Sequence, residues 1–142
     1  MGAVEALQDC LAAEHASLYG YGLLGGVVSG VSPGSSWQVL AISAYGEHRR
    51  RRDQLTELIT RLQAEPVSAR PVYKSPRDIV TLNDCRALGQ RIEGRCADFY
   101  GLAVSETVDD TREFAARALT RCCLREVDWG ADIEAFPAIK EF

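Results

Sequence analysis

The chain has 142 residues, of which 46% are hydrophobic and 25% charged, and its formal net charge is −4. This size and composition predict a single globular domain over residues 1–142 and exclude a disordered chain or two independent cores. The acidic balance argues against a nucleic-acid partner. No apolar run approaches the roughly 20 residues of a membrane span, and the N-terminus lacks a secretory signal pattern, so we expect a cytoplasmic protein with no membrane partner.

The first predicted helix covers residues 4–28. Apolar side chains recur there at spacings of three and four, which is typical of one buried helix face. Glu14 occupies the place in this apolar stripe between Leu11 and Leu18. A G-x-G-x-x-G run follows at 20–25, but the preceding segment has a helical and not a strand period, so no dinucleotide site is predicted.

The second predicted helix covers residues 36–64, after a turn rich in serine and glycine. His48 lies in the middle of its apolar stripe, and Arg52 lies one turn further along the same side. The basic run 49–52 is typical of a solvated helix face, because i,i+4 pairs with nearby acids balance much of its charge.

Residues 65–76 contain three prolines and cannot be helical throughout. Extended, such a segment spans roughly 40 Å, which is also roughly the length of a 27-residue helix. The connection can therefore run the whole length of a bundle, and we expect the helices on either side of it to be parallel. The other two connections are short and predict antiparallel neighbours.

The third predicted helix covers residues 78–105, with Glu93 beside its apolar stripe. A fourth helix follows a turn at 106–111, with Thr111 as its expected cap and Glu126 between the apolar positions 122 and 129. Residues 135–142 are expected to fray or to form an irregular strap. Four helices with short, long and short connections predict an all-α, ferritin-like four-helix bundle of up-down-down-up order.

Each predicted helix carries one ionisable group near its middle: Glu14, His48, Glu93 and Glu126. Buried charges are rare without partners, so we expect these groups to meet at the bundle centre. Two interpretations stay open. The four groups are candidate ligands of Fe, Mn or Zn, or they form a metal-free hydrogen-bonded network.

A dinuclear metal centre requires Glu-x-x-His on two of the helices. This chain instead has Glu and His adjacent, at 14–15 and 47–48, and adjacent residues diverge by about 100° on a helix. Arg51 and Arg52 also bring positive charge close to His48, which would repel a cation. We therefore expect no cofactor, with Fe, Mn or Zn as the candidates if a metal is bound.

The run A-E-H-A-S-L-Y-G-Y-G from residue 13, together with E-H-R-R-R-R-D from residue 47, resembles the DUF4439 family of actinobacterial ferritin-like proteins of unknown function. The resemblance covers nearly the whole chain. It implies a ferritin-like bundle, often paired as a dimer, and no assigned activity. The residues carried over from the family pattern form the expected buried polar cluster: Glu14, His15, Tyr19, His48, Arg52 and Glu93.

The five cysteines include no C-x-x-C pair, so they are interpreted as small buried hydrophobic residues. No catalytic residue is predicted. We expect a non-catalytic homodimer with a structural or interaction role, whose surface uses Trp37, Tyr45 and Trp129. The alternative is a metal-binding oxidase or storage-type protein that uses the bundle centre, and the sequence alone leaves enzymatic activity open.

Overall fold

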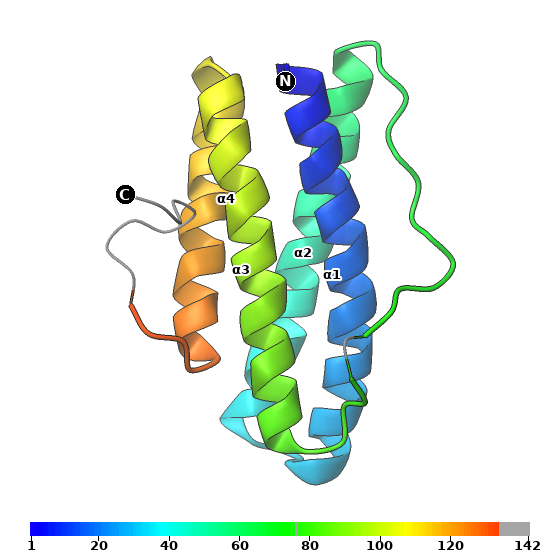
Figure 1. The fold of residues 1–142 in the computed structure, drawn as a ribbon, viewed down its shortest axis with the longest axis vertical. Coiled ribbons are helices and arrows are strands. Elements are labelled where there is room, and N and C mark those ends of the chain that lie inside the picture. Colours follow the sequence, from blue (N-terminus) through cyan, green and yellow to red (C-terminus); the bar gives the residue numbers. More distant parts are fainter. Residues whose placement is uncertain (76, 134–142) are drawn as a thin grey trace.

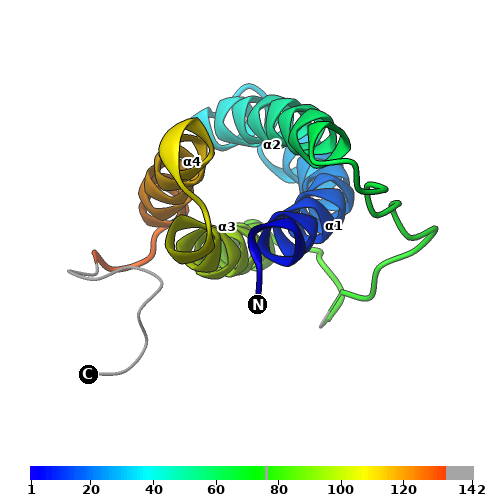
Figure 2. The same ribbon diagram turned by 90° about the horizontal axis from the view of Figure 1, so that it is seen from above.

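The computed structural model describes residues 1–75 and 77–133. Its helices are α1 (Ala3–Val31), α2 (Ser36–Arg61), α3 (Leu82–Glu106) and α4 (Asp109–Asp128). They pack side by side along one axis, and Figures 1 and 2 show them from the side and from above. The described residues contain no β-strand. The predicted all-α four-helix class is therefore confirmed.

The helix directions follow from contacts along α1. Tyr100, late in α3, reaches Glu14, while Cys85, early in α3, reaches the carbonyl of Leu24, so α1 and α3 are antiparallel. The short turn at 32–35 makes α2 antiparallel to α1 as well. Helices α2 and α3 are consequently parallel, as expected, and the connection between them descends the side of the bundle next to α1 (Figure 1).

Helix α4 begins earlier than the sequence suggested. Its N-cap is Val108, and the prediction of Thr111 as the cap was wrong because the acidic first turn starts at Asp109. Acidic side chains favour this end of a helix, since they face the positive pole of its dipole. Ile133 is 86% exposed, because the helix ends at Asp128 and does not carry this side chain into the core. The predicted strap at 135–142 lies outside the described residues.

Helix α3 begins later than predicted. Thr81 caps it and forms a capping box with Asp84, in which each side chain accepts a hydrogen bond from the other residue's backbone N–H. Helix α2 ends at Arg61, three residues earlier than expected, and the backbone turns at Gln63, whose φ is +60°.

The apolar core is divided into two clusters. One contains Leu7, Leu11, Leu55 and Ile59, and the other contains Tyr21, Leu24, Leu88 and Trp129 among its buried residues. Trp129 is fully buried, so the expectation that it lies on an association surface was wrong. It packs tightly over α3, where a Cβ at Gly89 would lie 2.5 Å from its ring. No helix among the described residues is both long and apolar enough to span a bilayer.

Candidate functional site

Polar side chains from the helices meet between the two apolar clusters. Glu14 of α1, His48 of α2 and Glu93 of α3 are all 0% exposed. His48 Nδ1 lies 2.5 Å from a Glu14 oxygen, and its Nε2 lies 3.0 Å from a Glu93 oxygen. Because each ring nitrogen faces a carboxylate, the doubly protonated imidazolium satisfies both contacts. The sequence thus located three of the four central groups, which the fold brings together.

Glu14 has partners at both of its oxygens. Its Oε1 accepts hydrogen bonds from Arg51 Nε at 2.8 Å and from the Tyr100 hydroxyl at 2.6 Å, and its Oε2 faces His48. Arg51 is 6% exposed and Tyr100 is 0% exposed, so this carboxylate is held entirely by protein groups. Hydrogen bonds to a charged group in such a dry environment are among the strongest in proteins.

Glu93 has partners at only one of its oxygens. Its Oε1 accepts a hydrogen bond from the Tyr21 hydroxyl at 2.5 Å, and that hydroxyl accepts one from Trp129 Nε1 at 2.8 Å. Arg125 Nε of α4 lies 3.7 Å from the same oxygen. Among the described residues, Glu93 Oε2 has no hydrogen-bond partner. The centre therefore holds one unsatisfied acceptor beside an otherwise paired network.

The charges at the centre set its protonation. Burial alone raises the pKa of Glu14, but the charges of His48 and Arg51 outweigh it and bring this pKa below its usual value of 4.5. Burial likewise opposes charging of His48, but the Glu14 carboxylate raises the pKa of His48 well above 6.5. At neutral pH, Glu14 is therefore ionised and His48 is protonated.

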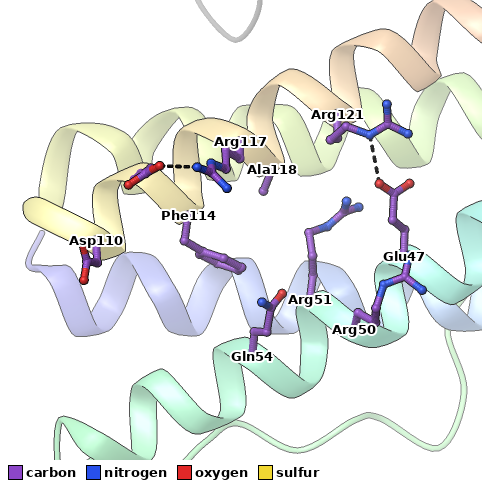
Figure 3. A pocket seen from close by; sticks show the side chains of 10 residues that line it. Glu47, Arg50, Arg51, Gln54, Asp110, Phe114, Arg117, Ala118 and Arg121 are labelled. Atoms are coloured by element: carbon purple, nitrogen blue, oxygen red, sulfur yellow. Dashed lines mark hydrogen bonds and ion pairs between the residues drawn. The ribbon is translucent and has the colours of Figure 1, made fainter.

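A second ion-pair group joins α2 to α4. Glu47 accepts hydrogen bonds from Arg121, at 3.0 Å, and from Arg125. Glu47 and Arg121 border an open groove of 460 Å³ between the two helices, into which Arg51 also points (Figure 3). The basic run of α2 is thus split by role, because Arg51 serves the centre and Arg52 pairs with Asp53.

Two buried thiols lie next to the centre. Cys96 Sγ is 3.1 Å from the Ser17 hydroxyl, and Cys122 Sγ is 3.7 Å from Arg51 Nη2. A hydrogen bond from Cys122 lowers the pKa of Cys96 to about 7, although burial opposes this. Donor atoms of Glu14, His48 and Cys96 lie within 4.8 Å of one another, which makes them the candidate metal-ligand group of the described residues.

Three residues of the expected cluster lie outside it. His15 Nε2 is 2.9 Å from the carbonyl of Val67, and the ring of Tyr19 packs against Tyr73, so both contact the crossover. Arg52 is only half-buried and pairs at the surface. The helix turns about 100° per residue, and the positions next to Glu14 and Arg51 therefore point away from the centre.

The fourth expected group is also displaced. Glu126 is half-buried and packs beside Gly94 of α3, and the residue that enters the centre from α4 is Arg125. Both missed arginines stand three residues after a buried position, as Arg51 follows His48 and Arg125 follows Cys122. Steps of three and four are nearly equivalent on a helix, so the H-x-x-R and C-x-x-R spacings were the available signal.

Comparisons with known proteins place the chain in a family. The family described as "Domain of unknown function (DUF4439)" matches residues 6–141. The crystal structure of a conserved hypothetical protein, rv2844, from Mycobacterium tuberculosis is similar, with a TM-score of 0.80 and 32% sequence identity. The similarity covers 89% of this chain and 94% of that one. No curated protein matches the sequence. The chain belongs to the DUF4439 family.

Proposed function

We propose that this DUF4439 protein is a ferritin-like bundle whose centre is stabilised by its own ion pairs, and that it acts as a non-catalytic homodimer in a structural or interaction role. The observation that carries the proposal is the position of Arg51. Its guanidinium donates to Glu14 and lies 3.1 Å from His48 Nδ1. A fixed cation thus stands beside the groups that would otherwise be free to bind a metal.

The comparison with dinuclear carboxylate bundles supports this proposal. Those bundles use one Glu from each of two helices and a Glu-x-x-His from each of the other two. Here Glu14 and Glu93 supply the single carboxylates, but α2 and α4 carry H-x-x-R and C-x-x-R. An arginine therefore takes the second position of each motif, and a guanidinium repels a metal ion where imidazole would bind it.

The formal charges of the centre also balance without an added ion. Glu14 and Glu93 contribute two negative charges, and protonated His48 and Arg51 contribute two positive ones. Glu47 offsets Arg125 beside them. A divalent cation would have to displace the His48 proton and repel both guanidiniums. Buried ionic groups are tolerated when they are mutually paired, which this arrangement provides.

An exposed face on the α1–α2 pair supports self-association. On α1, glycines at positions 22, 26 and 30 share one helix face, and a Cβ at each would meet nothing within 4 Å. On α2, Val39 and Ile42 are 66% and 68% exposed, and Tyr45 is 40% exposed. Small residues on α1 allow another helix to approach closely, exposed apolar side chains on α2 favour association, and twofold dimers are the commonest homo-oligomers.

Sedimentation equilibrium at micromolar concentrations tests the dimer. We expect about twice the chain mass of 15.6 kDa for the wild type and the monomer mass for Ile42→Glu. Val108→Glu is the matched control, because Val108 is 64% exposed and lies away from this face, before α4. A monomeric wild type, or a dimer that Ile42→Glu leaves intact, would contradict the proposed assembly.

A second candidate function is a metal centre. Two observations favour it: donor atoms of Glu14, His48 and Cys96 lie within 4.8 Å of one another, and Glu93 Oε2 has no hydrogen-bond partner among the described residues. A thiolate, an imidazole and carboxylates together suit Zn²⁺ or Fe. Elemental analysis of protein purified without chelator separates the candidates. Under our proposal the metal content stays far below one equivalent and is unchanged in Cys96→Ser. Near-stoichiometric metal that Cys96→Ser abolishes would establish the metal centre instead.

A further inference from the structure

A second cavity, separate from the polar centre, lies between α1 and α3 beneath the crossover. It has a volume of 540 Å³, within the range of small-molecule sites. Its inner wall is apolar and includes Ala16, Leu23, Leu88 and Ile92. Gly20 contributes to the close packing of this wall, since a Cβ there would lie 2.7 Å from Ile92 Cδ1. The cavity therefore offers a shaped apolar surface.

The crossover is fixed over this cavity by specific contacts from α1. Gln8 accepts a hydrogen bond from the backbone N–H of Val67 at 2.8 Å, and His15 contacts the Val67 carbonyl. Further along, the rings of Tyr19 and Tyr73 lie 5.5 Å apart. The Tyr73 hydroxyl also accepts a hydrogen bond from the backbone N–H of Arg70, at 2.9 Å. These contacts make the crossover a built wall of the cavity.

The rim of the cavity is positively charged. No carboxylate lines the cavity, whereas four cationic side chains do, namely Arg70, Lys74, Arg91 and Arg95. In the described part of the chain none of the four makes an ion pair, whereas other arginines such as Arg61 and Arg117 pair with acids on their own helices. The protein as a whole carries a net charge of −4. Unpaired positive charge gathered at one cavity of an acidic protein attracts anions.

We propose that this cavity binds a small amphipathic oxyanion, with its carboxylate or phosphate group at the basic rim and its apolar part against Ala16, Leu23 and Ile92. Arginine forks match both kinds of head group. The crossover covers the site, so the ligand enters as a single soluble molecule. This binding activity goes beyond the proposed structural role and does not depend on it.

Isothermal titration calorimetry with octanoate and octyl phosphate tests the proposal. We expect both probes to bind at one site per chain, with affinity that falls as salt screens the rim. Octanol, which lacks the charge, and inorganic phosphate, which lacks the apolar part, should each bind at least about tenfold more weakly. Binding of inorganic phosphate as tight as that of octyl phosphate would overturn the amphipathic assignment. Equal binding of octanol would overturn the role of the rim.

Two variants locate the binding. Arg91→Gln with Arg95→Gln should weaken octanoate at least about tenfold, while Arg61→Gln with Arg117→Gln removes the same formal charge elsewhere and should leave binding unchanged. Ala16→Phe leaves the basic rim unchanged and fills the apolar part of the cavity with a larger side chain. It should therefore abolish octanoate binding while the helical circular dichroism spectrum is retained. Equal losses in the rim variant and its control would place the binding outside this cavity and refute the proposal.

Discussion

The two buried carboxylates of the centre are alike in burial and differ in how they are paired. Glu14 and Glu93 are both 0% exposed, and both lie beside His48. Glu14 accepts hydrogen bonds at both oxygens, whereas Glu93 accepts them at Oε1 alone. Burial therefore does not decide how much a carboxylate stabilises the fold. The number of donors aimed at it does, and the Glu14 half of the network should carry most of the stability.

We expect the largest loss of stability when Glu14 is removed. Glu14→Met leaves Arg51 as an uncompensated buried cation and His48 with only one of its two carboxylates, so we expect a loss of about 3–5 kcal/mol in the free energy of unfolding. Replacing the three groups together, as Glu14→Met, His48→Leu and Arg51→Met, should cost much less than the sum of the single changes. Urea denaturation of the four variants measures this. Additive losses would show that the three side chains act independently.

An isosteric change tests the two carboxylates directly. Glu14→Gln places an amide N–H₂ group against side chains that themselves donate hydrogen bonds. We therefore expect a loss of about 2–3 kcal/mol in the free energy of unfolding. In Glu93→Gln the amide N–H₂ can take the position of the unpartnered Oε2, while the amide oxygen still accepts the hydrogen bond from Tyr21. We therefore expect a smaller loss, about 1 kcal/mol, in the free energy of unfolding. Equal losses in urea denaturation would remove the distinction between the two halves.

The pH dependence of stability should follow the two shifted groups. The pKa of His48 is raised in the folded state, so its contribution is complete below pH 6.5 and is lost as pH rises through the folded value. The pKa of Glu14 is lowered, so its contribution is present above pH 4.5 and is lost as pH falls through the folded value.

Stability should consequently be greatest between these two limits. Urea midpoints measured above pH 6.5 should fall more steeply for the wild type than for His48→Gln, in which only the buried thiols and tyrosines with raised pKa values still lose stability at alkaline pH. His15→Gln, which changes the chain's other histidine, is the control and should retain the wild-type slope. An alkaline slope equally steep in His48→Gln and the wild type would assign the loss of stability to another group.

We expect the smallest effect on stability from an exposed ion pair, which serves as the reference for the buried network. Arg117 and Glu113 form an i,i+4 pair on α4, with side chains 78% and 58% exposed. Glu113→Gln should change the free energy of unfolding by no more than about 0.5 kcal/mol, because solvent screens such pairs. A larger effect, measured in the same urea series, would mean that pairing outside the centre also contributes to the fold.

The helical periods and the proline-rich connection were sufficient to predict the bundle and its parallel α2–α3 pair. They also located Glu14, His48 and Glu93, because each interrupts or borders an apolar stripe. The sequence did not reveal that Arg51 and Arg125 are the inward-facing cations. That choice between a step of three and a step of four depends on the side of each helix that its neighbours cover, which is a property of the packed bundle.

The run of residues from position 13 in α1, which carries the family resemblance, also divides between two faces of its helix. Glu14 and Tyr21 serve the centre, whereas His15 and Tyr19 hold the crossover. The resemblance grouped Glu14, His15 and Tyr19 as one cluster because all three belong to the family pattern. In the structure they occupy two faces of one helix, and a single sequence motif therefore supports two separate features of the molecule.

The pairing of Glu47 with Arg121 and Arg125 bears on how the bundle opens. Helix α4 lies mainly against α3 and comes close to α2 at few points, so these ion pairs supply much of what joins the two helices. Local opening in proteins proceeds through the units with the fewest buried contacts. Backbone amides of α4 should accordingly exchange their hydrogens with solvent sooner than those of α1, and Cys122 should become reactive to thiol reagents while the remaining three helices are still folded.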